Sequence, residues 1–511
     1  MTRRWPPWTF GSGAAVAGLF NRLLALISLV AWLSLASQVR VLIGSRGLLP
    51  VGEFMDAVRA EGRVSPLDLP TLFWRFHGDG LLVAGTVVGA LLAMAALVGL
   101  RPRLCFGLST LLYLSYATVS RDFLSFQWDN LLLECGLLVT FLPADRPAPL
   151  VHFLFRLVLF KLYFESGIAK WQSDLGDWQD GSAMTYYYET APLPTFLAFT
   201  AHHLPVWWHH LESRATLVLE LGVPFLVFGP RRARLGAAFA FGFFQIVNAA
   251  TANYGFFCYL AAALSVFLLD DTDVARAGAR VAELAPAKLR PALARWLTIG
   301  TPPTTAAPPR PRGLVWLGRA GATLFAFVSL VDGLYAFTEP GRLLALAEPV
   351  FDLSRRFRLI NTYHLFGSIT RERIEPEVQT LAAGSALSRA GDPAAPWTPQ
   401  YLWHKPGDPR RAPDFVAPHQ PRVDFQLWFY GLSFRRREPS YVSTLVERMC
   451  EDPAAVQPLF RQPLPPHPAA VRLVYWRYQF ASRAEHRATG LWWRRTPVAM
   501  SRAIPCPSAQ R

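Results

Sequence analysis

The stretch FLSFQWDNLLLECGLL, residues 123–138, places Asp129 and Glu134 inside an apolar run long enough to enter a lipid bilayer. A carboxylate at that depth is costly unless it is paired, so such residues mark packing or functional sites. Asp129 and Glu134 are five positions apart and do not share a helix face. We therefore expect them to meet different partners, with Arg156 and Lys170 of the next apolar run as candidates.

The later apolar runs carry further polar side chains at membrane depth. Lys161 and Glu165 are four residues apart, so on a helix they share a face and can neutralise each other. Gln245 and Asn248 also share a face, which suits hydrogen bonding between helices. The sequence thus predicts an intramembrane polar network made of Asp129, Glu134, Arg156, Lys161, Glu165, Glu220, Gln245 and Asn248.

The composition is that of a multi-pass membrane protein rather than a soluble enzyme. Of the 511 residues, 52% are hydrophobic and only 17% are charged. The net charge of +15 is spread over loops and a tail, so we predict no nucleic-acid partner. Catalytic motifs and a CxxC pair are missing, and the paired histidines at 202–203 and 209–210 match no zinc spacing. We predict no metal and no cofactor.

Apolar runs of bilayer length recur nine times. They are 16–43, 81–100, 104–119, 128–142, 150–168, 214–229, 235–250, 254–269 and 313–337. If every run spans the membrane, the Arg-rich loops fall on one side, which the positive-inside rule makes the cytoplasm. We expect the first run to be a retained helix rather than a cleaved signal peptide.

This sidedness divides the chain into four parts. Residues 1–270 form a transmembrane bundle with an extracytoplasmic loop at 169–213. A Pro-rich cytoplasmic linker follows at 271–312, and a last transmembrane helix at 313–337. The tail, 338–511, is then extracytoplasmic.

The tail predicts a small β-rich domain. Its runs VDFQLWFYGLSF (423–434) and VRLVYWRYQF (471–480) alternate apolar and polar residues, as half-buried strands do. Pro- and Gly-rich connectors separate them. Cys450 and Cys506 of this tail could pair if it lies outside the cytosol. The expected fold is an α-helical bundle of about nine spans followed by this β-rich domain.

Several segments, in order along nearly the whole chain, resemble the lipase maturation factor family. They include FLSFQWDNLLLECGLL, RLVLFKLYFESGIAKW (156–171), YYETAPLP (187–194), RLINTYHLF (358–366) and HKPGDPRRAPDFVAPHQPRVDFQLWF (404–429). This chain departs from the family pattern at Tyr187, where histidine is usual, and at His364, where glycine is usual. The resemblance implies a multi-span protein of the endoplasmic reticulum membrane in animals. The composition and the absence of an N-x-S/T sequon favour a bacterial inner-membrane member here. It also implies a role in helping secreted lipases fold and assemble.

On this basis, the predicted partners are a secreted lipase or related hydrolase and membrane lipids, and the oligomeric state is left open. The predicted function is that of a non-catalytic maturation factor. The aromatic 169–213 loop suits either a membrane interface or a surface that grips a client. Residues expected on the client-binding face are Trp171, Tyr188, Glu189, His203, Trp207, Lys405, His419, Arg422 and Asp424.

A second hypothesis is enzymatic. The family is distantly similar to the membrane region of vitamin K-dependent γ-carboxylase-like proteins. Under this hypothesis, proton chemistry would fall to Lys161, Lys170, Asp129, Glu134 or Glu220 in a lipid-accessible cavity. A transporter is not favoured, because the chain shows no matching halves with broken helices.

Overall fold

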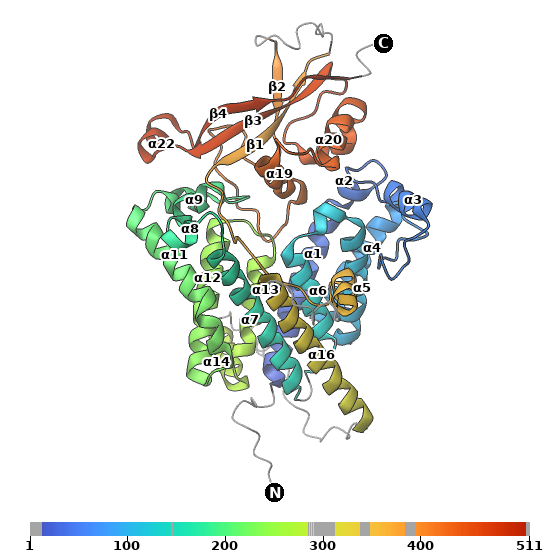
Figure 1. Ribbon diagram of the computed structural model, residues 1–511, viewed down its shortest axis with the longest axis vertical. Coiled ribbons are helices and arrows are strands. Elements are labelled where there is room, and N and C mark those ends of the chain that lie inside the picture. The colour runs from blue at the N-terminus through green and yellow to red at the C-terminus, as the bar shows by residue number, and fades with distance from the viewer. Residues whose placement is uncertain are drawn as a thin grey trace.

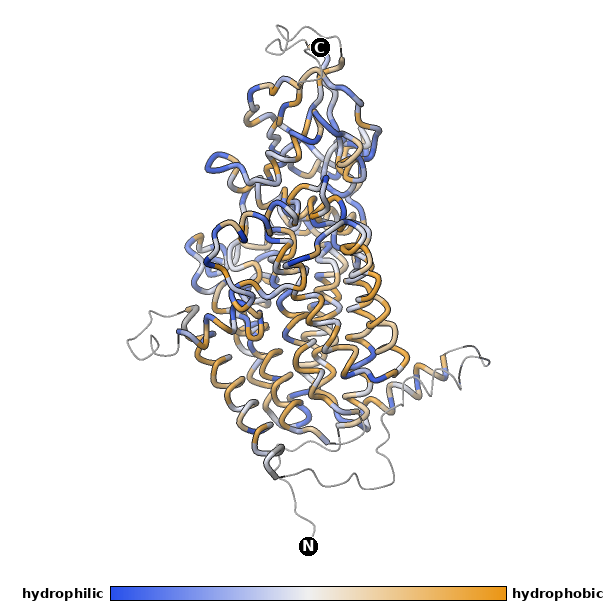
Figure 2. Tube along the Cα trace, turned by 90° about the vertical axis from the view of Figure 1, so that its right-hand side faces the viewer, coloured by the Kyte–Doolittle hydropathy of each residue, from blue (hydrophilic) through white to orange (hydrophobic). Residues whose placement is uncertain are grey.

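The computed structural model describes residues 13–506, apart from 145–146, 285, 287, 289, 291–311, 338–347 and 384–394. A helical bundle forms one end of the molecule, and a domain built on an antiparallel sheet caps it (Figure 1). Apolar residues concentrate along the bundle helices, whereas the capping domain mixes polar and apolar residues (Figure 2).

Each of the nine predicted apolar runs coincides with helical structure. The main helices are α1 (Ala14–Ala36), α4 (Asp79–Leu97), α5 (Pro102–Val119), α6 (Gln127–Val139), α7 (Pro149–Trp171), α11 (Val206–Leu221), α12 (Arg231–Thr251), α13 (Phe257–Leu264) and α16 (Arg312–Phe337). Within the described residues, four stretches are long and apolar enough to cross a membrane by themselves: Ala14–Ala36, Asp79–Leu97, Arg231–Thr251 and Trp316–Leu334. A count of nine spans stays a prediction.

Three stretches differ from what the sequence predicted. The run 16–43 is broken, because α1 ends at Ala36 and a separate helix α2 (Val39–Ile43) follows. The 169–213 loop is largely helical, with α8 (Asp177–Asp180), α9 (Ala183–Thr190), α10 (Phe196–His202) and the first half of α11.

The predicted linker 271–312 is also wrong at its start, where α14 (Asp271–Leu284) forms a helix against the bundle. Asp271 accepts hydrogen bonds from the backbone N–H groups of Ala15 and Val16 at 2.9 and 3.1 Å. An acidic side chain at the N-terminus of α1 accepts hydrogen bonds from otherwise unpaired N–H groups and interacts favourably with the helix dipole. The proline-rich part of the linker, 301–311, lies outside the described residues.

The capping domain contains a five-stranded antiparallel sheet. Its strand order is β2 (Trp397–Gln400), β1 (Arg373–Leu381), β3 (Ala470–Phe480) and β4 (Trp493–Met500), and β5 (Ile504–Pro505) also pairs with β3. The prediction of a strand at 471–480 is confirmed by β3. Cys450 and Cys506, whose pairing the sequence left open, form a disulfide between α20 (Ser440–Glu451) and the chain after β5.

The prediction of a strand at 423–434 is wrong, because this segment is the helix α19 (Arg422–Ser433). Nearly every residue from Arg422 to Gly431 is buried. Because the segment has almost no exposed face, the spacing of its apolar residues does not show whether it is a helix or a strand. Pro421 precedes the first turn and Asp424 lies in it, both of which favour a helix start. With α20 and α22 (Arg483–Thr489), the domain is mixed α and β rather than β-rich.

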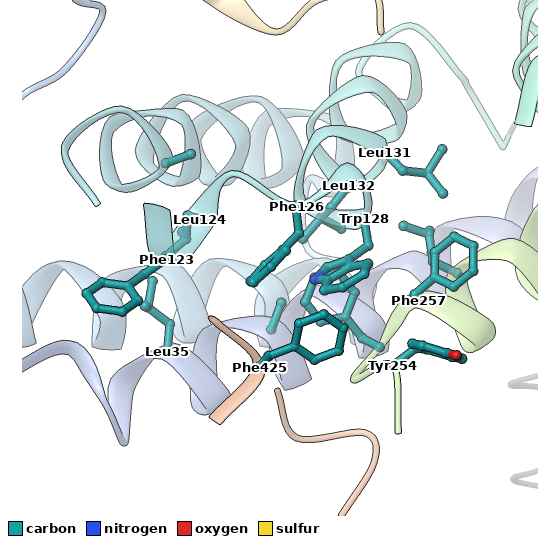
Figure 3. Packing of buried hydrophobic residues seen from close by; sticks show 14 of the residues in the cluster. Leu35, Phe123, Leu124, Phe126, Trp128, Leu131, Leu132, Tyr254, Phe257 and Phe425 are labelled. Carbon is teal, nitrogen blue, oxygen red and sulfur yellow. The ribbon is translucent and has the colours of Figure 1, made fainter. Parts of the chain in front are cut away.

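Helix α19 lies between the sheet and the bundle, and its aromatic residues pack onto α6. The Phe425 ring lies 5.1 Å from the rings of both Phe126 and Trp128, measured between centroids, with edge-on geometry (Figure 3). Such aromatic pairs add to the free energy gained by burying their apolar area. The same helix therefore belongs to the cores of both regions.

Candidate functional site

A buried ion pair joins the bundle to the capping domain. Arg422 of α19 donates from Nη1 to Oδ2 of Asp129 at 2.6 Å and from Nη2 to Oδ1 at 2.8 Å. The hydroxyl of Tyr113 donates to the same carboxylate at 2.6 Å, and the carbonyl of Phe123 accepts from Arg422 at 2.8 Å. Asp129 and Arg422 are fully buried, so each neutralises a charge that would otherwise be very costly.

The partners of Asp129 and Glu134 differ from those predicted, which were Arg156 and Lys170. Lys170 instead pairs with Glu220 of α11 at 2.7 Å, and Arg156 donates to the carbonyl of Phe267 at 2.7 Å. Helix periodicity says which residues share a face, but it carries no information about a distant segment that inserts beside them. The cation that Asp129 meets comes from the tail.

Glu134 is bonded by a second tail segment, 358–366, which runs along the bundle. Tyr363 donates its hydroxyl to Glu134 at 2.6 Å, and Asn361 donates its amide at 3.2 Å. Lys161 donates to the carbonyl of Asn361 at 2.7 Å, and Glu165 accepts from the backbone N–H of Tyr363 at 2.8 Å. Lys161 and Glu165, predicted to pair with each other, thus both hold this segment.

A third buried cluster lies within the capping domain. Glu375 of β1 forms ion pairs with Arg373 at 2.6 Å and with Lys405 at 2.5 Å, and all three side chains are buried. Lys405 also donates to the carbonyl of Asp424 at 3.3 Å. Burial lowers the pKa of Lys405, and the neighbouring Glu375 carboxylate opposes that shift.

Arg373 of this cluster and Trp428 of α19 fix the last turn of α9 and the residues after it. Arg373 donates to the carbonyls of Glu189, Ala191 and Pro192, and Trp428 of α19 donates to the carbonyl of Thr190 at 2.8 Å. The Glu189 carboxylate accepts from the backbone N–H of Phe480 on β3 at 2.6 Å. The 169–213 region and the capping domain are therefore one hydrogen-bonded unit.

Glu189 gives this unit a predicted pH dependence. Burial raises the pKa of Glu189 from 4.5 to about 7, although the Phe480 N–H and Arg373 oppose the shift. A raised folded-state pKa contributes stability that is present below pH 4.5 and lost as the pH rises through about 7. We expect Glu189→Gln to remove this loss, making the variant more stable than wild type at pH 8 by up to about 3 kcal/mol.

Thermal unfolding of the detergent-solubilised protein between pH 5 and pH 8 checks this expectation. Glu447→Gln is the matched control, because Glu447 is exposed on α20. Equal pH profiles for wild type and Glu189→Gln would contradict it.

The residues predicted for a client-binding face separate into two groups. Trp171 and Trp207 are 57% and 65% exposed, and His203 and Glu189 are half-buried. Tyr188 is buried and donates to Glu212 at 2.9 Å.

The four tail residues predicted for this face lie inside the protein. Lys405, Arg422 and Asp424 are buried, and His419 bonds Ser34 of α1 at 2.9 Å. The expectation that these four tail residues form an outer face is therefore wrong, because they are turned inward as packing contacts.

Of the other network residues, Gln245 donates to the Tyr163 hydroxyl of α7 at 2.9 Å, as predicted for a bond between helices. Asn248 accepts from the Tyr187 hydroxyl at 3.5 Å. Sequence reasoning missed Arg373, Glu375 and Tyr363, although RLINTYHLF had stood out as a distinctive string. Over the part of the chain that the structure describes, no group of three or more His, Cys, Asp or Glu could hold a metal ion.

Two family models match the two regions that these contacts join. The lipase maturation factor transmembrane domain matches residues 15–276, and the lipase maturation factor C-terminal domain matches residues 359–503. The chain belongs to the lipase maturation factor family. As a lipase maturation factor homologue, it is an integral multi-pass membrane protein with a C-terminal domain that carries a small antiparallel sheet.

Curated lipase maturation factors match over most of their length. Lipase maturation factor 2 of Homo sapiens is 31% identical, over 93% of this chain and 80% of the relative. Lipase maturation factor 1 of Bos taurus is 31% identical, over 92% of this chain and 85% of the relative. No solved structure matches the chain at a significant level. In this lipase maturation factor homologue, Asp129 lies in the first matched domain and Arg422 in the second, so their ion pair joins the two.

Proposed function

We propose that this protein is a non-catalytic maturation factor that holds a secreted lipase or related hydrolase while the client folds or assembles. Family membership is the observation that carries the proposal. The buried contacts of Arg422, Tyr363 and Arg373 support it, because they give the capping domain a fixed position on the bundle. A scaffold with fixed geometry loses less conformational entropy when it binds a client.

We propose that the capping domain is extracytoplasmic. The disulfide between Cys450 and Cys506 suits an oxidising compartment. Helix α14 lies at the opposite end of the bundle (Figure 1), and Arg231 and Arg234 at the start of α12 pair with Asp270, the residue just before α14. That placement follows the positive-inside rule. The compartment would be the periplasmic side of a bacterial inner membrane, or the lumen in a eukaryote.

The start of α11 is the proposed contact surface for the client. Val206 and Trp207 are 63% and 65% exposed, and Trp208 is also exposed. Aromatic residues here also suit a membrane interface. Large exposed aromatic side chains next to a polar domain are nevertheless the typical anchors of protein recognition.

We expect Trp207→Ala/Trp208→Ala to lower the activity per molecule of a secreted lipase at least about tenfold, as the loss of one or two interface anchors would. The variant would be expressed in a strain that lacks the chromosomal gene. Active lipase would be divided by its immunodetected amount. The matched control is Trp316→Ala, at a 68% exposed position on α16. Equal losses in both variants, or none in either, would contradict the proposed surface.

The enzymatic alternative has a separate test at Lys161. Its bonds to Asn361 and Ser329 support a packing role, because they occupy its ammonium group inside the protein. We expect both Lys161→Met and Lys161→Ala to lower the amount and thermal stability of the membrane-inserted protein. Normal amount and stability with lost lipase maturation would instead favour proton chemistry at this residue.

A further inference from the structure

A cavity of about 380 Å³ lies inside the bundle between α7, α9, α11 and α12, and of the proposed client-contact residues only Trp208 lines it. Its wall is mainly aromatic and aliphatic, with Tyr163, Tyr187, Leu219, Phe244, Tyr254 and Phe257 among the lining residues. A volume near the lower end of the range for ligand pockets fits one acyl chain better than two.

The cavity opens toward the lipid-facing side of the bundle. The exposed lining residues at its rim include Leu211 and Ala215 of α11 and Phe243 of α12. Helix α12 is long and apolar enough to span a membrane, and it also exposes Phe239 and Ile246. Apolar side chains exposed on such a helix contact hydrocarbon. A ligand that enters between α11 and α12 therefore comes from the bilayer.

One buried polar group in the wall indicates what the ligand must carry. Gln245 lines the cavity and is only 3% exposed. Its Nε2 donates to Tyr163, but its Oε1 has no hydrogen-bond partner among the described residues. A buried acceptor left without a donor is destabilising, so a ligand that donates a hydrogen bond here is favoured. Other polar groups of the wall have partners inside the protein, since Tyr187 bonds Tyr254 at 2.6 Å and Lys170 forms an ion pair with Glu220 at 2.7 Å.

We propose that this cavity binds the acyl chain of a monoacyl lipid whose free glycerol hydroxyl donates to Gln245 Oε1. Monoacylglycerols and lysophospholipids share this chemistry. Burial of the chain supplies affinity in proportion to its length, and the hydroxyl selects acylglycerols over simple alkyl esters. The inference rests on the cavity alone and does not depend on which client the protein serves.

Photolabelling of the full-length protein in phosphatidylcholine nanodiscs tests the proposal. The two probes are a monoacylglycerol and a lysophosphatidylcholine, each with a diazirine in the acyl chain. The result expected is label on buried lining residues such as Tyr254 and Phe257, which bulk lipid does not reach. If just one of the two probes labels these buried residues, that probe shows whether the ligand is a monoacylglycerol or a lysophospholipid. Label confined to exposed apolar faces with both probes would overturn the proposal.

Two variants on one helix provide the matched comparison. Thr216→Phe places a ring in the cavity wall, whereas Val218→Phe alters a 67% exposed position of α11 that does not line the cavity. We expect Thr216→Phe to lower the buried label at least about tenfold and Val218→Phe to leave it unchanged. Unchanged buried label in Thr216→Phe would count against the cavity.

Competition on the wild-type protein keeps the test independent of how Thr216→Phe folds. Unlabelled monoacylglycerol should displace the probe at lower concentration than the methyl ester of the same fatty acid, which has no donor. Gln245→Leu should abolish that difference. Equal competition by the two compounds in wild type would exclude the hydrogen bond to Gln245.

Discussion

Arg422→Met is expected to destabilise the folded protein by about 3–5 kcal/mol, because it leaves Asp129 buried without its cation. Tyr113 still donates to the carboxylate, but one neutral hydrogen bond does not replace a bidentate guanidinium. The loss should appear as a lower unfolding temperature of the detergent-solubilised full chain and as less protein in the membrane.

A double-mutant cycle separates the ion pair from the general effect of shortening a side chain. Asp129→Asn removes the buried charge, so Asp129→Asn/Arg422→Met should lose less stability than the sum of the two single variants. Arg437→Met, at an exposed position just after α19, serves as the surface control and should change little. Additive losses around the cycle would mean that the pair does not couple the two domains.

Glu375→Gln is expected to have an effect of similar size, about 3–5 kcal/mol, because it leaves Arg373 and Lys405 buried without the carboxylate that pairs with both. The pKa of Lys405 is already lowered by burial, and removing Glu375 takes away the main charge that opposes this shift. A lowered folded-state pKa contributes stability that is lost as the pH falls. The loss of unfolding free energy in Glu375→Gln, relative to wild type, should therefore be smaller at pH 9.5 than at pH 7.

The control for this variant is Glu372→Gln. Glu372 precedes β1 and pairs with Arg477, and the side chains are 54% and 41% exposed. We expect a change of about 1 kcal/mol or less there, with no dependence on pH over this range. Thermal unfolding at the two pH values measures both variants. A deficit of Glu375→Gln that is constant with pH would show that Lys405 stays charged without its partner.

The helical bundle could be predicted from the sequence because a bilayer-length apolar run is a strong local signal. The strand β3 was equally clear, since its two faces meet different surroundings. Helix α19 was not, because the sheet and α6 bury it on nearly every side and its pattern therefore has no clean period. Residues 301–311 of the predicted linker stay a prediction.

The site was predictable as a set of costly charges, but not as a set of contacts. Asp129 and Glu134 stood out because a buried carboxylate needs a partner. The partners Arg422 and Tyr363 lie more than two hundred residues further along the chain, and no local spacing links them. The partners of Arg422 lie on a segment far away in the sequence, so local spacing does not show that this residue is paired and buried. The polar string around it therefore suggested an exposed binding face.

The activity per molecule of secreted lipases and esterases, in strains with and without this gene, tests the proposed maturation role most directly. Enzyme activity would be divided by the immunodetected amount of each enzyme, and the whole exoproteome would be quantified alongside. We predict that at least one secreted lipase loses activity per molecule, or disappears, in the deletion strain, and that the wild-type gene restores it. An unchanged exoproteome with unchanged specific activities would contradict a role in lipase maturation.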